Sequence, residues 1–484
     1  MLFTTPEYFL FFTIILIAVE LLRKRLWQHL ALLVASYYFY WCSGSIHILL
    51  LVLVTFTSFF CGARIYHAAE KKQKKLWLAI GTIIPLAILG YFKYIDFGVS
   101  SINAVLGTVG VSVSLPLLYV LLPVGISFFT FQALSYIFDI YLGKLKPEEK
   151  FHRYALFIAF FPALVAGPIV RASEFLPQLQ EKISITGENI QAGVTLILWG
   201  LFKKMVIADN LGHYVDIVYT TPSEYPSLYI IAATILFGIQ IYCDFSGYAH
   251  IAIGCARILG FRIPENFNLP YLAQNIQIFW RKWHMTLSRF IRDYVYIPLG
   301  GNRKGHGRTY ANLFASMVIC GLWHGAAWTF VLWGAYHGGL LLLHRYFMGE
   351  KKLGAASRFL ASNPGLLIRV LITQILVFFG WMIFRANSLD DLTICIQKII
   401  FFDFSFTTMT KLAVLGGTAV LILAFIAMYN KRIAEFTKMA LTYDYLSFCS
   451  RMKIRYWWIY IAALGFAVLL LSPPETPEFI YFAF

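Results

Sequence analysis

A succession of long apolar runs constrains this fold more than any other feature of the chain. A helix that spans a bilayer needs about 20 predominantly apolar residues, and about a dozen runs are long enough to cross or enter one. They are residues 8–22, 27–42, 46–66, 76–95, 115–142, 154–170, 189–208, 227–243, 310–343, 366–384, 412–429 and 456–472. Only 13% of the residues are charged, whereas soluble domains have about 25%. The sequence therefore predicts an all-α polytopic membrane protein.

A single transmembrane domain can use all 484 residues, because the usual relation between length and domain number applies to soluble chains. We expect N-terminal helices over 1–150, a core over 151–345 and C-terminal helices over 346–484. The run 310–343 is too long for one straight span. The stretch "FPALVAGPIVR" (161–171) contains prolines and a glycine, which at membrane depth must be buried in protein or line a cavity. It is predicted to be a re-entrant segment.

The basic residues lie mainly in short gaps between the apolar runs. The formal net charge is +16, but this arrangement is typical of cytoplasmic loops that face anionic lipid headgroups, not of nucleic-acid binding. Basic gaps at 23–25, 70–75 and 144–150 alternate with gaps that lack Lys and Arg, so the N-terminus is expected outside. The first run lacks a preceding basic region and is interpreted as a span, not as a cleaved signal peptide. Beyond residue 170 the interrupted runs leave the topology open.

The seven cysteines are scattered along the chain without any CxxC spacing. This pattern indicates neither a zinc site nor a disulfide framework, and no metal site is expected. Most of these cysteines are expected to be small apolar packing residues.

The segment 255–308 is too polar to span a membrane, because charged and amide side chains alternate there with aromatic ones. It is predicted to form interfacial amphipathic helices that end in a Gly-rich basic loop. If the stretch around "FWRKWHMTLS" is one helix, Trp280, His284 and Leu287 share a face. His284 would then point toward the protein together with apolar side chains.

His324 lies deep in an apolar run, in the sequence "GLWHGAAW". No Asp, Glu, Lys or Arg occurs between Arg308 and Arg345, and on a helix His324 is about 24 Å beyond Arg308. An ionisable group at this depth indicates a functional site, and burial favours the neutral imidazole that can act as a general base. The alternative is a hydrogen-bonded packing residue. Gly321 and Gly325 leave room for a substrate atom or for close helix approach.

Other polar residues in apolar surroundings have structural alternatives as well. His337 would point well away from His324 on a continuous helix, so it is expected to be structural or to line a cavity. Asp244, in "CDFSGY", is a candidate channel residue, and a buried polar network is its alternative. For Asp139 and Arg385 we favour the structural network.

Together these stretches resemble the membrane-bound O-acyltransferase (MBOAT) family, and within it the bacterial branch that O-acetylates polysaccharides. That branch includes the membrane subunit of alginate O-acetyltransferase and its peptidoglycan and cellulose relatives, while the D-alanyl-lipoteichoic acid transfer protein is more distant. The similar stretches are "PVGISFFTFQALSYIFDIY" (123–141), "FFPALVAGPIVR" (160–171), "WGLFKKMVIAD" (199–209), "DFSGYAHIAIG" (244–254), "NFNLPYLAQNIQIFWRKWHMTLSRFIRDYVYIPLGGNRKG" (266–305), "GLWHGAAWTFVLWGAYHG" (321–338), "GWMIFRA" (380–386) and "FIYFAF" (479–484). The resemblance implies the MBOAT fold, with about 11 transmembrane helices and with re-entrant and interfacial helices around a central channel.

The resemblance also implies roles for both histidines. The family's invariant histidine maps onto His324, the implied catalytic base, and its second polar position maps onto His284, across a channel. The candidate channel residues are Trp280, Trp283, Asp244, Ser246, Trp323 and His337. The chain departs from the branch after "DFSGY", where Ala249 and His250 replace the usual Ser-Asp pair. Asp244 is therefore expected to be the only carboxylate in that region.

An acyltransferase of this kind is implied to use a cytoplasmic thioester donor, acetyl-CoA above all, and an acceptor outside the bacterial cytoplasmic membrane. No permanently bound cofactor is expected. Arg303, Lys304 and Arg308 are candidate contacts for the anionic donor, with membrane anchoring as their alternative. The implied partners are membrane lipids and an extracytoplasmic acetyltransferase or esterase-like protein. The alternative functions are D-alanyl transfer from a carrier protein and a transporter or flippase, although no internal repeat of the transporter kind is evident.

Overall fold

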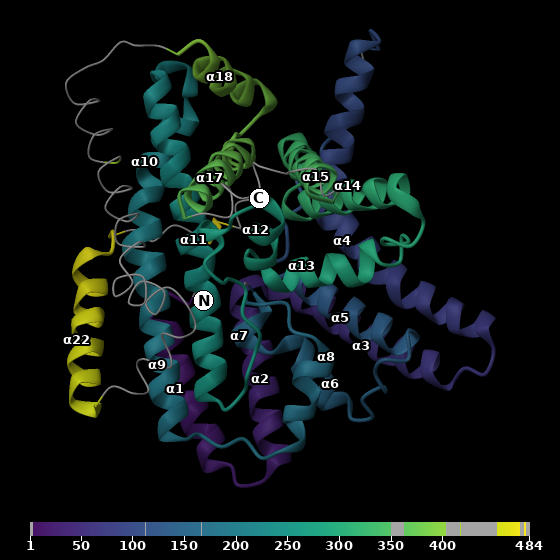
Figure 1. Ribbon diagram of the computed structural model, residues 1–484. Coiled ribbons are helices and arrows are strands. Elements are labelled where there is room, and N and C mark those ends of the chain that lie inside the picture. Colours follow the sequence, from purple (N-terminus) through teal and green to yellow (C-terminus); the bar gives the residue numbers. More distant parts are fainter. Residues whose placement is uncertain are drawn as a thin grey trace. The chain divides into compact units, whose positions relative to one another are not determined.

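The computed structural model describes residues 3–111, 113–165, 167–349, 363–402, 417, 453–474 and 479–480. Within these ranges the regular secondary structure is entirely helical, as the sequence predicts (Figure 1). The chain divides into two compact units. The first comprises Met1–Ile197 and Tyr248–Pro264, and the second comprises Leu198–Gly247 and Glu265–Ala483.

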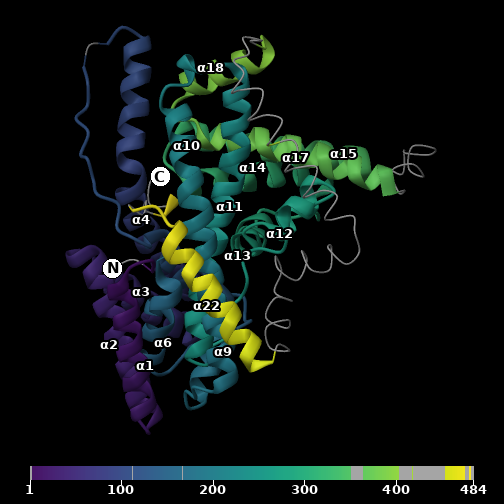
Figure 2. The same cartoon turned by 90° about the vertical axis from the view of Figure 1, so that its left-hand side faces the viewer.

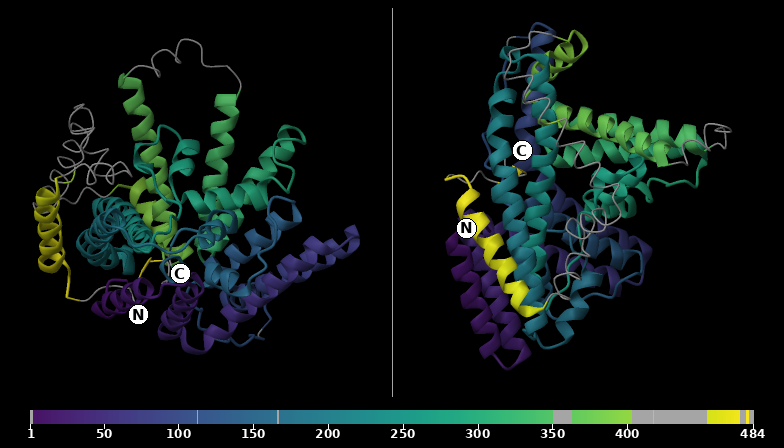
Figure 3. Two further views of the ribbon diagram at one scale, coloured as in Figure 1. Left: turned by 90° about the horizontal axis from the view of Figure 1, so that it is seen from below. Right: turned by 60° about the vertical axis from the view of Figure 1, so that its left-hand side comes forward.

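The first unit is built mostly from the N-terminal helices. They are α1 (Pro6–Leu21), α2 (Arg25–Gly44), η1 (Ser45–His47), α3 (Ile48–His67), α4 (Lys71–Thr108), α5 (Ile126–Tyr141), α6 (Phe151–Ala159), α7 (Phe161–Leu164), α8 (Ala172–Phe175), η2 (Leu176–Gln180) and most of α9 (Gly187–Leu201). Figure 3 shows α1 and α2 side by side in purple. α5 is apolar on all sides, and nearly all of its residues are buried, with α3 and α4 as its main neighbours.

Two predicted boundaries in this unit are wrong. α4 has 38 residues and continues through the gap expected after residue 95. α5 begins only at Ile126, so the first part of the run 115–142 is not helical. Pro123 disfavours a helix through this stretch. Gly125 has a φ of 72° directly before α5, a conformation that side chains other than glycine rarely adopt.

The Pro- and Gly-containing stretch 161–171 is buried within the first unit. It begins with α7 and continues through an irregular segment to α8, and its described residues up to 170 are all buried. Such burial is what irregular backbone at membrane depth requires. The re-entrant course of this stretch stays a prediction.

The second unit contains the remaining helices. They are η3 (Phe202–Ala208), α10 (Asp209–Thr220), η4 (Pro222–Glu224), the first part of α11 (Ser227–Ile258), η5 (Pro270–Leu272), α12 (Ile276–Lys282), α13 (Met285–Ile291), η6 (Arg292–Tyr296), α14 (Gly305–His324), α15 (Trp328–Gly349), α17 (Asn363–Arg385), α18 (Leu389–Ile400) and α22 (Ile454–Leu471). The run 310–343 is divided between α14 and α15, so it is not one straight span. α22, in yellow in Figure 2, packs against η3. Apart from residues 417, 479 and 480, the predicted run 412–429 and the tail 479–484 lie outside the described residues.

Six helical stretches among the described residues are long and apolar enough to cross a membrane. They are Ile48–His67, Lys71–Thr108, Gly187–Thr220, Ser227–Ile258, Gly365–Arg385 and Ile454–Leu471. These stretches support the prediction of an all-helical, multi-pass membrane protein. The larger expected total of about 11 spans stays a prediction, as do the single domain and the outward N-terminus.

Candidate active site

His324 is the last residue of α14, and it is only 2% exposed. The helix ends there because Gly325 takes an extended conformation, with φ −157° and ψ 153°. α14 and α15 approach each other closely, since a Cβ atom on Gly334 would lie 2.5 Å from the carbonyl oxygen of Met317. Gly321 faces the backbone of α15 in the same way. Close helix approach is thus one predicted role of these small residues that the structure confirms.

His284 does not lie on the continuous helix that the sequence pattern predicts. α12 ends at Lys282 and α13 begins at Met285, while His284 has a left-handed backbone with φ 40° and ψ 56°. A neighbouring segment supplies hydrogen-bond partners for the backbone where the helix is interrupted. The Asn268 N–H donates to the Lys282 carbonyl, and the Met285 N–H donates to the Asn266 carbonyl, both at 2.9 Å. The prediction of one helix is therefore wrong, although His284 is fully buried, as predicted. Left-handed residues other than glycine are uncommon and cluster at functional sites.

The two histidines lie in one aromatic cluster of the second unit. Their ring centroids are 6.4 Å apart. Trp323 contacts both rings, with centroids 5.6 Å from His284 and 5.0 Å from His324. Phe245 covers His284 at 4.7 Å. The structure therefore brings together the two residues that the sequence indicates as the base and its neighbour.

The electrostatic surroundings of His284 favour an uncharged ring. Both of its ring nitrogens are buried and have no hydrogen-bond partner among the described residues. Burial lowers the pKa of His284 from 6.5 to about 3, so the imidazole is neutral at physiological pH. A neutral imidazole has one donor and one acceptor, and buried groups of this kind are usually satisfied. A substrate or a water molecule can supply the partners.

His337 belongs to the same cluster, because α14 and α15 are separate helices and not the continuous helix on which its predicted direction depended. The ring centroid of Trp333 is 5.0 Å from that of His324 and 4.9 Å from that of His337. Trp280 contacts Trp333 at 5.5 Å and His337 at 5.2 Å. The sequence analysis missed Trp333, although it lies one helical turn before His337 and therefore on the same face.

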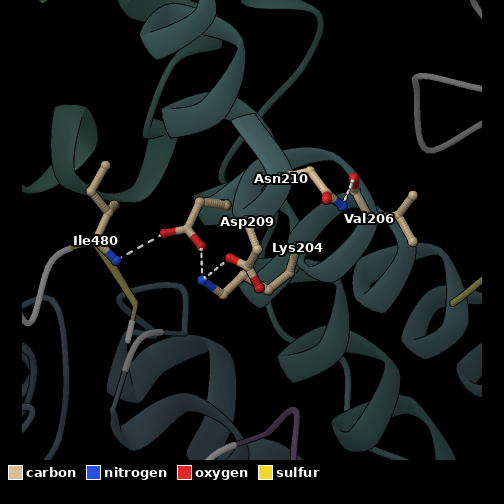
Figure 4. A network of polar contacts seen from close by, with 6 residues as sticks. Lys204, Val206, Asp209, Asn210 and Ile480 are labelled. Atoms are coloured by element: carbon tan, nitrogen blue, oxygen red, sulfur yellow. Dashed lines mark hydrogen bonds and ion pairs between the residues drawn. The ribbon is translucent and has the colours of Figure 1, made fainter. Parts of the chain in front are cut away.

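Asp244 is part of a buried ion network, whose members Lys204, Asp209 and Ile480 are labelled in Figure 4. The Lys204 ammonium lies 2.6 Å from Asp209 Oδ1 and 2.8 Å from Asp244 Oδ1. The second oxygen of Asp244 accepts a hydrogen bond of 2.9 Å from the backbone N–H of Ile480. The expectation that Asp244 is the only carboxylate in this region is therefore wrong. Asp209 shares its lysine, so Asp244 belongs to the kind of buried polar network that was its alternative. Its role as a channel residue stays a prediction.

Ser246, another predicted channel residue, contacts a second buried lysine. Lys203 Nζ lies 3.3 Å from Ser246 Oγ, and 5.6 and 5.4 Å from the ring centroids of Trp199 and Tyr242. Within the described ranges no carboxylate pairs with Lys203, in contrast to the adjacent Lys204. The ammonium group of Lys204 is therefore paired with carboxylates, whereas that of Lys203 contacts a hydroxyl group and aromatic rings.

A cavity of about 720 Å³ lies next to the histidine cluster within the second unit. The residues that line it include four arginines and no acidic residue: Arg281, Arg289, Arg292 and Arg345. The Arg292 guanidinium is paired with the neighbouring Asp293 at 2.7 Å. The predicted donor contacts Arg303, Lys304 and Arg308 are exposed and do not line this cavity, although the neighbouring Asn302 does. Their role in donor binding stays a prediction. The cavity itself is suited to an anionic ligand.

One face of α14 leads from this cavity to His324. Leu313, Met317 and Cys320 line the cavity, and together with His324 they have the spacing of a single helix face. His324 lies one turn beyond Cys320, about 6 Å further along the helix axis. Trp280, which contacts Trp333 and His337, lines the same cavity. The cavity therefore reaches the edge of the histidine cluster.

Comparisons with known proteins place both histidines in a matched region. Residues 150–350 match the model of the MBOAT, membrane-bound O-acyltransferase family. The probable alginate O-acetylase AlgI of Pseudomonas aeruginosa is 38% identical over 391 residues, which cover 81% of this chain and 73% of that protein. The peptidoglycan O-acetyltransferase of Helicobacter pylori is 36% identical over 395 residues, with coverages of 76% and 73%. The teichoic acid D-alanyltransferase of Bacillus subtilis is 30% identical over 277 residues, with coverages of 54% and 68%.

These similarities extend over most of the chain and include the segments that build the histidine cluster. The resemblance noted in the sequence is thereby confirmed. This chain belongs to the membrane-bound O-acyltransferase family.

Proposed function

We propose that this chain is a membrane O-acyltransferase that moves an acyl group, namely acetyl, from a cytoplasmic thioester to an extracytoplasmic acceptor hydroxyl. The transferred acetyl group ends as an O-acetyl group on a cell-envelope polysaccharide. The observation that carries the proposal is the buried pair His284 and His324, with ring centroids 6.4 Å apart, next to a cationic cavity. The relatives named for alginate and peptidoglycan O-acetylation support the acetyl group and the polysaccharide.

In this reaction neutral His324 is the general base. It takes the proton of the acceptor hydroxyl while the hydroxyl oxygen attacks the thioester carbonyl carbon. Collapse of the tetrahedral intermediate breaks the carbon–sulfur bond, and the imidazolium gives its proton to the departing thiolate. The N–H group of His284 donates a hydrogen bond to the carbonyl oxygen, where negative charge develops. Proton transfer of this kind typically contributes about 10²–10⁴-fold to the rate.

The cationic cavity is the proposed binding site of the donor. Its four guanidinium groups, of which that of Arg292 is paired with Asp293, suit a ligand that carries several phosphate groups. Acetyl-CoA is such a ligand, whereas a pantetheine arm on a carrier protein brings only one phosphate. This difference supports acetyl-CoA as the substrate over D-alanyl transfer, whose named relative covers only 54% of this chain.

Replacing Arg281 or Arg345 by alanine should raise KM for acetyl-CoA about 10-fold or more, with little change in kcat. A lost hydrogen bond to a charged group costs about 1.5–3 kcal/mol, and phosphate contacts far from the reacting carbonyl act equally on ground state and transition state. Steady-state release of CoA in inverted membrane vesicles, which hold the acceptor, measures this effect. Arg262→Ala, at an exposed arginine that does not line the cavity, is the matched control and should leave KM unchanged. A raised KM in Arg303→Ala or Arg308→Ala alone would place the donor at the Gly-rich loop instead.

The membrane arrangement is part of the same proposal. A single domain with about 11 spans, including re-entrant and interfacial helices, encloses a central channel. The chain lies in the cytoplasmic membrane of a bacterium with its N-terminus outside, which the basic loops at 23–25 and 144–150 support. Membrane lipids surround the bundle, and an extracytoplasmic transferase or esterase-like protein carries the acyl group onward to the polymer.

Inverted membrane vesicles that contain this chain and receive labelled acetyl-CoA test the proposed function. We expect release of CoA and label on luminal polysaccharide or on a partner protein, and neither in vesicles with His324→Ala. Label that depends on a carrier-protein thioester and not on acetyl-CoA would favour D-alanyl transfer. Vesicles that neither release CoA nor take up label from either donor would contradict acyl transfer.

A further inference from the structure

We propose that Trp280 limits the size of the acyl group that reaches His324, so that the enzyme accepts short acyl donors such as acetyl-CoA and excludes longer ones. This inference rests on the proposed function, because it concerns the donor that occupies the cationic cavity. It adds a residue that determines acyl-chain specificity.

Trp280 lies where the cavity meets the histidine cluster. Its side chain lines the cavity, yet it is only 8% exposed and its ring contacts two rings that do not line the cavity. These are Trp333, with an interplanar angle of 73°, and His337, with an angle of 88°. Trp333 is in turn 5.0 Å from His324. The two indole rings therefore stand between the cavity and the proposed base.

The side chains that α14 contributes to the cavity wall are smaller than the indole of Trp280. Ser316, Met317 and Cys320 line the cavity there, and the same helix face continues to His324 one turn further on. Serine and cysteine side chains are small, and methionine is flexible. Among the residues at this inner end, Trp280 has the largest side chain, so its indole is the main obstacle along the path to His324.

The charge distribution determines which end of the donor meets this obstacle. Arg281 is exposed and lines the cavity, whereas Trp280 and Cys320 are buried. Phosphate groups that bind the arginines leave the thioester end directed toward the buried end. The acyl chain is therefore the part of the donor that must pass Trp280.

The test compares acetyl-, butyryl- and hexanoyl-CoA as donors for the full-length protein in inverted membrane vesicles, which hold the acceptor, with released CoA as the readout. One methylene group in an apolar pocket changes kcat/KM by about 10–200-fold. The unmodified protein should therefore prefer acetyl over hexanoyl by more than about 100-fold. Trp280→Ala should reduce this preference at least about tenfold, mainly by raising kcat/KM for the longer donors. Trp280→Phe should admit butyryl but still exclude hexanoyl.

Trp381→Ala is the matched control. Trp381 is 1% exposed, packs 4.7 Å from Trp283 between ring centroids, and does not line the cavity. Its removal disturbs aromatic packing without widening the path, so the acetyl preference should persist. An unchanged preference in Trp280→Ala, or an equal loss of preference in Trp381→Ala, would overturn the inference. If Trp280→Ala does not fold, Trp280→Phe and Trp280→Leu give the same comparison.

His324→Ala in the same assay separates this inference from the proposed function. It should stop CoA release from all three donors. Native activity in His324→Ala would contradict the proposed function whatever the chain-length profile. If Trp280 substitutions leave the preference for acetyl over longer donors unchanged while His324→Ala is inactive, only the role of Trp280 is contradicted. If the protein does not use acyl-CoA donors, acyl phosphopantetheine thioesters of the same three chain lengths give the same comparison.

Discussion

Replacing His324 by alanine should abolish acyl transfer while the protein still folds. The substitution removes the proposed general base, whose proton transfer typically contributes about 10²–10⁴-fold, and no other buried imidazole lies on α14. In cells, O-acetyl groups on the envelope polysaccharide should fall to background. In inverted membrane vesicles that hold the acceptor, release of CoA from acetyl-CoA should fall by at least about 100-fold.

Two further variants make this result specific. His306→Ala is the matched control, because His306 is an exposed histidine near the beginning of the same helix, and its removal should leave activity unchanged. His284→Ala should lower kcat by about 10²–10³-fold, the cost typical of losing one hydrogen-bond donor to a developing oxyanion. Native acetylation in cells that express only the His324→Ala form would show that this imidazole is a packing residue.

Replacing Lys204 by methionine should destabilise the protein by about 3–5 kcal/mol, the cost typical of breaking a buried ion pair by removing one partner. Lys204 is 2% exposed and binds both Asp209 and Asp244. Its loss leaves two buried carboxylates side by side without a countercharge. Titration with SDS in mixed micelles, which unfolds helical membrane proteins, measures the difference in the free energy of unfolding.

The neighbouring lysine provides the control for this effect. Lys203 is equally buried, but its ammonium contacts Ser246 and two aromatic rings and not a carboxylate. Lys203→Met should therefore leave stability within about 1 kcal/mol or raise it, because no buried anion is left behind. Equal destabilisation by both substitutions would contradict the view that the ion network of Figure 4 is what makes Lys204 structural.

Part of the site could be predicted from the sequence because local rules suffice there. The absence of charges around His324 indicates its burial, and the length of the run 310–343 indicates a break. The helix face that connects Cys320 to His324 is also readable from spacing alone. The turn before α5 is a similar case, since Pro123 and Gly125 are helix-breaking residues inside the predicted run 115–142.

Other features depend on contacts between distant parts of the chain, which no local pattern reveals. The break at His284 contains neither proline nor glycine, and the backbone of Asn266 and Asn268 maintains it. Lys204 finds one carboxylate nearby and the other on α11. Trp333 becomes a site residue only because α14 and α15 fold back on each other. In each case tertiary packing overrides or completes the local signal.

We propose that His284 and His324 form one acyl-transfer site, which the donor reaches from the cationic cavity. The most direct measurement is a density map of the full-length protein with a CoA analogue in which a methylene group replaces the thioester sulfur. We expect phosphates at Arg281 and Arg345, a displaced Trp280 ring, and the carbonyl oxygen within about 2.6–3.2 Å of an imidazole nitrogen. An analogue bound elsewhere, with both histidines still sealed by their aromatic neighbours, would contradict it.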